Sequence, residues 1–360
     1  MGGNKMKEQK QIELKSYAKI NLALDIVGKL PNGYHLLDGV MQIIDLYDIV
    51  TITLCPRTEA DSCSDNNLND TVIDIRGERG ANTVAENSPI NTANLDEGFR
   101  VLITSTSKDI PLNEDNIVYK AFKKIEEIYT EKFKKVISEE YATLKIHIEK
   151  NVPIEAGLAG GSGNGAVTLL GLNQMLGLGI EYDQLCSIGK SIGADVPFSL
   201  SAQVKANQEK LENFQGQGFY AARTEGIGEV LTPVTPYEGE ILISKPKIGV
   251  STKKVYESVK LNEIEEHINV ELLIHGLEQK NFEEIKKNMG NILEKYSEIM
   301  YDGIMYTKDK MIQHVSEGRV MMSGSGPTVF AISPNREELY HAYEEMKEIN
   351  RDTVLTRTIF

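Results

Sequence analysis

The feature that most constrains this chain is a nine-residue segment, residues 157–165, in which five residues are glycine. Glycine reaches positive φ and has no Cβ, so successive N–H groups can turn toward one point and an anion can approach the backbone closely. An apolar helical pattern follows at once, and the start of a helix adds unpaired amides and the positive end of its dipole. The segment therefore predicts a phosphate-binding loop.

The net charge makes a local site of this kind necessary for any anionic substrate. Lys and Arg total 39 against 53 Asp and Glu, which gives a formal net charge of −14. A chain this acidic repels anions at long range and lacks the basic surface that non-specific nucleic-acid binding needs. We therefore expect small-molecule partners and no nucleic acid.

Two other interpretations of the glycine segment remain open. Residues 161–166 satisfy the dinucleotide fingerprint G-x-G-x-x-A, and Asp183 follows at the spacing of its ribose-binding acid. That fingerprint needs its glycines immediately after a strand, whereas the preceding strand pattern ends near Lys150. A plain flexible loop is the third interpretation.

Hydrophobic periodicity predicts an α+β fold. Apolar and polar residues alternate over 17–28 and 144–150, which is typical of strands with one buried face. The other expected strands are 41–54, 72–76, 101–106, a pair within 219–232, and 240–246. The expected helices are 117–129, 164–177, 183–193, 252–259, 269–278, 281–289 and 335–349. Strands and helices interleave without a regular βαβ order, which favours α+β over a doubly wound sheet.

The length of 360 residues suggests two domains. Two prolines, Pro233 and Pro236, mark the boundary expected between residues 11–237 and residues 238–360. Two polar stretches within the first domain, 57–98 and 203–218, are expected to be insertions.

Nothing in the sequence predicts a membrane or secreted protein. No run approaches about 18 consecutive apolar residues, and the polar first residues contain no apolar signal segment. The three cysteines, Cys55, Cys63 and Cys186, suit neither a zinc site nor a disulfide framework, and no histidines cluster at metal-ligand spacing. We expect a cytoplasmic protein that makes no membrane contact and has no metal site of its own.

Four short patterns outside the glycine segment carry side chains suited to chemistry. Lys19 interrupts a strand-like run, and Asp195 lies just before Pro197, which stops the preceding helix. Taken alone, Lys19 is explained as an alternating residue that faces water and Asp195 as a cap or turn residue. Residues 33–35 fit an ordinary turn, and residues 323–327 fit a hairpin connection. Each pattern is weak by itself.

Together and in this order, these patterns resemble those of the GHMP small-molecule kinases. The matching motifs, spread over about residues 15–335, are A-K-I-N-L, P-N-G-Y-H, P-x-x-A-G-L-x-G-G-S, G-A-D-V-P-F and S-G-S-G-P. The glycine loop and S-G-S-G belong to the whole family. N-G-Y-H and G-A-D-V-P-F are similar to those of the branch that phosphorylates the 2-hydroxyl of a diphosphocytidyl polyol, diphosphocytidyl-methylerythritol, in non-mevalonate isoprenoid synthesis.

The resemblance implies a two-domain α+β kinase fold with the active site in the interdomain cleft, and ATP with Mg²⁺ as the phosphoryl donor. It implies that Asp195 is the general base and Lys19 its electrostatic partner. The ATP-binding residues that it implies are Gly157, Leu158, Ala159, Gly160, Gly161, Ser162, Gly163, Asn164, Asn116 and Lys120. The substrate-binding residues that it implies are Asn21, Tyr34, His35, Tyr256, Ser323, Gly324 and Ser325, with the three aromatic side chains at the cytidine.

These roles agree with the chemistry of phosphoryl transfer, which asks the protein for positioning and charge neutralisation more than for covalent chemistry. A tertiary alcohol is weakly acidic, so a carboxylate must take its proton while a nearby cation stabilises the developing charge. Aromatic side chains on both faces hold a pyrimidine.

The glycine segment departs from the usual family loop at Ala159, Gly163 and Gly165, where Gly, Ser and Ala are usual. Gly163 removes a hydroxyl suited to contact with phosphate or metal. There are two alternative functions. One is phosphorylation of mevalonate or homoserine, and the other is nucleotide binding by a catalytically silent homologue. For assembly, a homodimer remains open.

Overall fold

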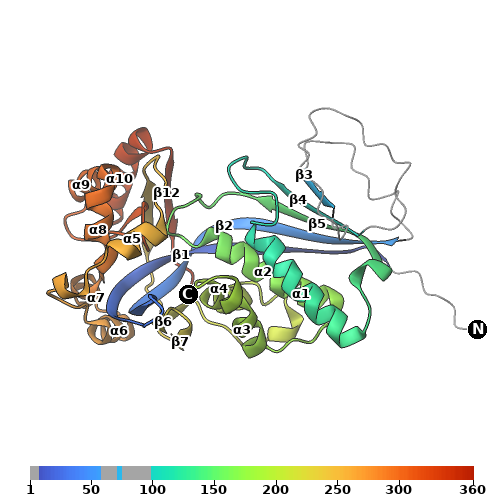
Figure 1. Ribbon diagram of the computed structural model, residues 1–360. Coiled ribbons are helices and arrows are strands. Elements are labelled where there is room, and N and C mark those ends of the chain that lie inside the picture. The colour runs from blue at the N-terminus through green and yellow to red at the C-terminus, as the bar shows by residue number, and fades with distance from the viewer. Residues whose placement is uncertain (1–7, 58–70, 75–98) are drawn as a thin grey trace, which may run out of the picture.

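Two long strands organise the fold of the computed structural model, which describes residues 8–57, 71–74 and 99–360. Strand β1 (Lys10–Lys29) and strand β2 (His35–Pro56) pair antiparallel along nearly their whole length. Figure 1 shows this hairpin running through both halves of the molecule. The predicted strands 17–28 and 41–54 lie inside it. The turn between the strands has a φ of +91° at Gly33, a conformation that favours glycine.

The larger sheet has eight strands within the described residues, with β2 at its centre. Strand β5 pairs with the half of β2 far from the hairpin turn, and β6 pairs with the half near it. The remaining strands complete the sheet at its edges. The bounds are β3 Thr71–Asp74, β4 Arg100–Ser105, β5 Tyr141–Glu149, β6 Ala221–Gly226, β7 Val230–Pro233 and β9 Gly290–Asn291.

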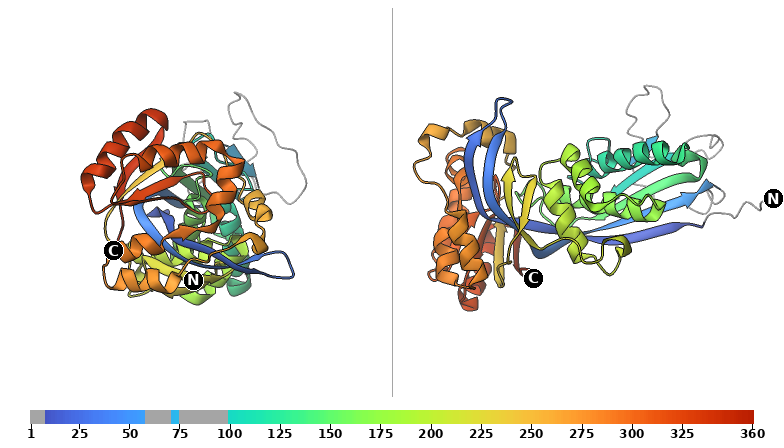
Figure 2. Two further views of the ribbon diagram at one scale, coloured as in Figure 1. Left: turned by 90° about the vertical axis from the view of Figure 1, so that its left-hand side faces the viewer. Right: turned by 90° about the horizontal axis from the view of Figure 1, so that it is seen from below.

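Four helices pack on one face of this sheet, as Figures 1 and 2 show. They are α1 (Ile117–Phe133), α2 (Gly160–Leu176), α3 (Tyr182–Ile192) and α4 (Val196–Ala206). Their apolar faces and the inner face of the sheet form one core, which includes the fully buried Phe122, Ile146 and Leu170. Helix α2 is buried almost all round, which is why its sequence is apolar rather than amphipathic.

A four-stranded sheet in the order β10-β11-β8-β12 forms the second half of the molecule. Its strands are β8 Glu240–Lys245, β10 Arg319–Met322, β11 Val329–Ile332 and β12 Asp352–Arg357. Its helices are α5 Thr252–Ser258, α6 Val270–Glu278, α7 Phe282–Asn288, α8 Ile292–Met300, α9 Asp302–Ile312 and α10 Arg336–Ile349. The sequence predicted these helices apart from α8 and α9. Single 3₁₀ turns lie at Ile137–Glu139, Glu212–Phe214 and Leu261–Glu263.

The hairpin ties the two halves together. Its part near the turn contributes Ile20, Leu22 and Val40 to the same buried cluster as Ile243 and Phe330 of the smaller sheet. Strands β1 and β2 therefore contribute to both cores, although both lie before the predicted boundary at 237/238. We keep that boundary as a proposal based on the proline-rich connection.

The stretch 203–218, predicted to be a polar insertion, is partly buried. Its first residues end helix α4, and Gln203 is fully buried. The Gln203 amide donates to the Tyr17 carbonyl and accepts from the Tyr17 N–H, so it continues the hydrogen bonding of β1. Asn207 contacts the backbone of Lys15 in the same way. Most of the other predicted insertion, 57–98, lies outside the described residues.

The cysteines differ in part from expectation. Cys186 is a free thiol, whereas Cys55 is disulfide-bonded, so the prediction that the cysteines do not suit disulfides is wrong at Cys55. Burial raises the pKa of Cys186 to about 11, which keeps that thiol protonated. Among the described residues, no helix has both the length and the apolar character needed to cross a membrane.

Candidate active site

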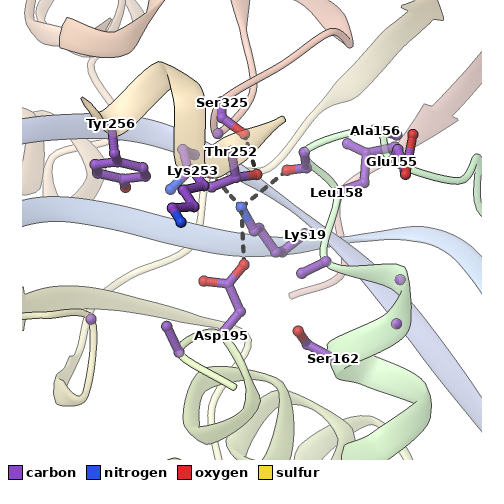
Figure 3. Close-up of a pocket in the computed structure, with 18 of the residues that line it drawn as sticks. Lys19, Glu155, Ala156, Leu158, Ser162, Asp195, Thr252, Lys253, Tyr256 and Ser325 are labelled. Atoms are coloured by element: carbon purple, nitrogen blue, oxygen red, sulfur yellow. Dashed lines mark hydrogen bonds and ion pairs between the residues drawn. The ribbon is translucent and has the colours of Figure 1, made fainter. Parts of the chain in front are cut away.

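A cavity of about 1110 Å³ lies where the β1–β2 hairpin, the glycine segment and helix α5 meet. Residues of β1, β2, α2 and α5 line it, together with Asp195, the residue before helix α4, and the turn at residues 324–325. Figure 3 shows the region around Lys19, with Asp195 on one side of the lysine and the glycine segment on another. The cavity therefore joins parts of the chain that are far apart in the sequence.

The glycine segment forms one wall as a short loop followed by the first turn of α2. Gly157 has a φ of +71° and Ala159, the residue before the helix, a φ of +55°. No side chain caps the N-terminus of α2, so its first N–H groups are free to bind an anion. The dinucleotide interpretation fails, because β5 ends at Glu149, well before Gly157, and Asp183 lies in the first turn of α3.

Gly163 does not line the cavity. A Cβ added at this position would lie only 2.5 Å from the Ser16 hydroxyl oxygen, which is itself buried without a hydrogen-bond partner. Glycine at 163 is therefore explained by the close approach of β1 to α2. A serine there would have to displace the Ser16 side chain.

Lys19 and Asp195 form the charged centre of the cavity. The Lys19 ammonium donates to the Asn21 side-chain oxygen (2.7 Å) and to the Gly157 carbonyl (3.0 Å). It lies 3.8 Å from a carboxylate oxygen of Asp195, whose side chain is 34% exposed while that of Lys19 is 5% exposed. Burial lowers the pKa of Lys19, and the Asp195 carboxylate opposes this change. The carboxylate caps no backbone N–H of α4, so it can meet a substrate hydroxyl.

Two aromatic side chains face each other at the hairpin end of the cavity. The rings of His35 and Tyr256 lie 5.5 Å apart between centroids and are inclined by 36°. The His35 Nε2 atom is buried without a hydrogen-bond partner, and burial and then Lys29 lower the pKa of this histidine. His35 is therefore neutral at pH 7, with a ring nitrogen left for a ligand. Tyr34, next to it, is 59% exposed.

The turn at residues 323–326 joins the smaller sheet to this site. The Ser323 hydroxyl donates to the Gly157 carbonyl (3.2 Å), and the Ser325 hydroxyl is hydrogen-bonded to that of Thr252 on α5 (2.8 Å). The turn thus contacts both the glycine segment and the helix that carries Tyr256.

The structure brings most of the predicted site residues to this one cavity. Those that line it are Lys19, Asn21, Tyr34, His35, Asn116, Gly157, Leu158, Ala159, Gly160, Gly161, Ser162, Asn164, Asp195, Tyr256, Gly324 and Ser325. Lys120 is exposed on α1 and does not line the cavity, and Ser323 contacts it only through Gly157. The Asn116 side chain is used locally, since it accepts from the Val118 N–H as the cap of α1.

Sequence reasoning missed several charged residues of the cavity, chiefly Lys29, Asp38, Lys150 and Lys253. Lys253 had a usable signal, because it lies in the short sequence S-T-K-K-V-Y, residues 251–256, that ends in Tyr256. Lys150 had none, since it follows an alternating strand and looks solvated. Its ammonium is in fact 2.8 Å from the buried carboxylate of Asp48.

Comparison with known proteins gives consistent results. Residues 116–203 match the GHMP kinases N terminal domain, and residues 273–352 match the GHMP kinases C terminal family. The 4-diphosphocytidyl-2-C-methyl-D-erythritol kinase of Clostridioides difficile (strain 630) is 36% identical over 349 residues, covering 94% of this chain and 95% of that protein. The kinase of the same name from Caldicellulosiruptor saccharolyticus is 34% identical over 346 residues, covering 96% of each chain.

Solved structures share the fold across both halves. A crystal structure of 4-(cytidine 5'-diphospho)-2C-methyl-D-erythritol kinase gives a TM-score of 0.64 at 20% identity, covering 96% of this chain and 98% of that chain. Homoserine kinase from Cytophaga hutchinsonii gives a TM-score of 0.60 at 16% identity, covering 100% of this chain and 97% of that chain.

Proposed function

Since this chain belongs to the 4-diphosphocytidyl-2-C-methyl-D-erythritol kinase family of GHMP kinases, we propose that it transfers a phosphoryl group from ATP to the 2-hydroxyl of that diphosphocytidyl polyol. The chain has the two-domain α+β fold of this family. The reaction serves isoprenoid synthesis by the non-mevalonate route.

One observation carries the choice of substrate. The cavity holds a Lys19–Asp195 pair beside an uncapped helix N-terminus and, at its other end, the contacting rings of His35 and Tyr256, on which a pyrimidine can stack. Stacking rings and a neutral His35 nitrogen fit an uncharged, hydrogen-bonding base such as cytosine. Mevalonate and homoserine have no aromatic ring for that end of the cavity, so we favour the cytidine substrate over them.

The proposed chemistry uses residues already in contact. The substrate oxygen attacks the γ-phosphorus, the bond from that phosphorus to the bridging oxygen of ADP breaks, and the hydroxyl proton passes to Asp195. Lys19 stabilises the negative charge that develops as the proton leaves, because its ammonium is buried beside the carboxylate. The N–H groups at the start of α2 bind the phosphates of ATP.

Magnesium would neutralise charge on the ATP phosphates when bound. The described residues contain no group of three or more His, Cys, Asp or Glu side chains placed to hold a metal ion. The oxygen donors near the helix start nevertheless fit this ion: Asn164 has a buried side-chain oxygen without a partner, and Ser162 adds a hydroxyl. We propose that phosphate oxygens supply most of the ligands and that these two side chains assist.

The test is an assay that couples ADP release to phosphorylation of 4-diphosphocytidyl-2-C-methyl-D-erythritol. We expect turnover of this compound that far exceeds turnover of mevalonate or homoserine. Turnover of those alcohols alone would assign the chain to another GHMP activity. ATP binding by calorimetry without any phosphorylated product would show a silent homologue.

The rate should depend on the protonation of Lys19. Because burial lowers the pKa of this lysine from its ordinary 10.5, the ammonium loses its proton at a lower pH than an exposed lysine does. We expect kcat/KM to fall as pH rises through that lowered pKa, giving an alkaline limb below pH 10.5. Initial rates across the alkaline range would show it, with circular dichroism at each pH as the control for unfolding. A flat profile up to pH 10.5 would contradict a charged role for Lys19.

The remaining proposals concern the partners, the location and the assembly of the protein. We propose that the partners are small molecules only, and that the protein works in the cytoplasm, where ATP is available. A homodimer stays a proposal, and sedimentation velocity is the measurement for it.

A further inference from the structure

We propose that Lys253 binds the diphosphate of the substrate and so sets the preference for a diphosphocytidyl compound over a free nucleoside. The inference rests on the proposed function, because it names the group that recognises one part of that substrate. Lys253 lies on helix α5, three residues before Tyr256.

The position of Lys253 matches the layout of the substrate. A diphosphocytidyl polyol has the base at one end, the acceptor alcohol at the other and the diphosphate between them. In the cavity, Tyr256 and His35 mark the base end and the Lys19–Asp195 pair marks the acceptor end. Figure 3 shows the Lys253 side chain between Tyr256 and Lys19, which is where a diphosphate joining the two ends would lie.

The other lysines that line the cavity are placed for different tasks. Lys19 is held by Asn21 and the Gly157 carbonyl beside the acceptor. Lys150 is buried and donates to the Asp48 carboxylate. Lys29 pairs with His35 across the hairpin, at the base end. Among the lysines in the described lining, Lys253 is therefore the cation left for the middle of the cavity.

Lys253 is also free to move to a ligand. Its ammonium lies 3.8 Å from Glu257, and the two side chains are 84% and 62% exposed. An exposed ion pair of this kind contributes little, so exchanging it for a diphosphate costs little. The exchange gains charge-assisted hydrogen bonds to phosphate, in a protein whose net charge of −14 otherwise repels the substrate.

Helix α5 is held in place for this contact. The Thr252 hydroxyl is hydrogen-bonded to Ser325, and the Ser251 hydroxyl accepts from the Lys254 N–H as the cap of the helix. These contacts fix the backbone beside Lys253, so the lysine and Tyr256 approach one ligand from a common support.

The first experiment compares Lys253→Ala with Lys254→Ala in the kinase assay. Lys254 is the next residue on the same helix and does not line the cavity, so it controls for the loss of a surface charge. We expect Lys253→Ala to raise KM for the diphosphocytidyl substrate by about 10-fold, the effect of about one charge-assisted hydrogen bond. We expect kcat and KM for ATP to change by less than about twofold, and Lys253→Arg to restore most of the affinity.

The second experiment measures the binding of CDP and cytidine by calorimetry, without turnover. The wild-type protein should prefer CDP, and Lys253→Ala should lose most of that preference while cytidine affinity stays the same. An unchanged preference, or a rise in KM for ATP instead, would overturn the role of Lys253. Failure of the wild-type protein to phosphorylate the substrate would contradict the proposed function, whereas the calorimetry decides the role of the lysine separately.

Discussion

Asp195→Asn should lower kcat by about 10³-fold while leaving the affinity for ATP nearly unchanged. The amide has the shape of the carboxylate but cannot accept the proton of the substrate hydroxyl, and it removes the charge that faces Lys19 at 3.8 Å. The substitution should not unfold the protein, because the Asp195 side chain is partly exposed and caps no helix N–H. Single-turnover rates would measure the chemical step, and calorimetry would measure ATP binding.

The matched control is Asp183→Asn. Asp183 is an exposed acid in the first turn of α3, outside the cavity, so its loss should leave kcat within about twofold. Retention of more than about a tenth of the wild-type rate by Asp195→Asn would show that another group accepts the proton.

Gly157→Ala should lower kcat/KM by about 10²-fold, since small displacements of reacting groups have effects of this size. An added Cβ would lie 2.2 Å from the Ser323 carbonyl oxygen, a backbone atom that cannot rotate away, and the φ of +71° disfavours any side chain. The Gly157 carbonyl accepts from the Lys19 ammonium, so a shift of Gly157 moves this buried ammonium. Steady-state rates for both substrates would measure the effect.

Gly177→Ala is the control for Gly157→Ala, because it introduces backbone strain without crowding. Gly177 ends helix α2 with a φ of +63° and would place a Cβ with no atom within 4 Å. The Gly177→Ala substitution should lower the free energy of unfolding by about 1 kcal/mol and leave kcat/KM unchanged. Thermal unfolding of both variants shows what fraction is folded under assay conditions. Full activity in Gly157→Ala would mean that the contact between the glycine segment and residues 323–326 is not needed.

Much of the fold follows from local patterns, and the failures have local causes. Alternation located β1 and β5, although residues 16–26 of β1 are buried on both faces. Helices α4 and α9 were missed because their apolar residues do not gather on one face, and the amphipathic helix α8 was missed as well. Composition also gave no sign that the polar Gln203, at the start of the stretch 203–218, is buried and hydrogen-bonded to β1.

The residues of the candidate site also differ in whether the sequence could identify them. The glycine segment could be identified from sequence, because its backbone freedom belongs to the residues themselves. Lys19 could not, since strand alternation is equally consistent with a lysine that faces water. Only the family resemblance suggested its role, and only the structure places Asn21, Gly157 and Asp195 around its ammonium.

By itself, then, the sequence determined most of the strands and helices, the backbone freedom of the glycine segment and the acidic balance that makes a local anion site necessary. The tertiary structure alone decided which charges are buried and which face the cavity: Lys150 is paired with Asp48, whereas Lys253 is left open to a ligand. The physical reason is the separation along the chain over which each effect acts. Periodicity and glycine content act within a few residues, whereas burial and charge pairing depend on segments that approach one another only when the chain has folded.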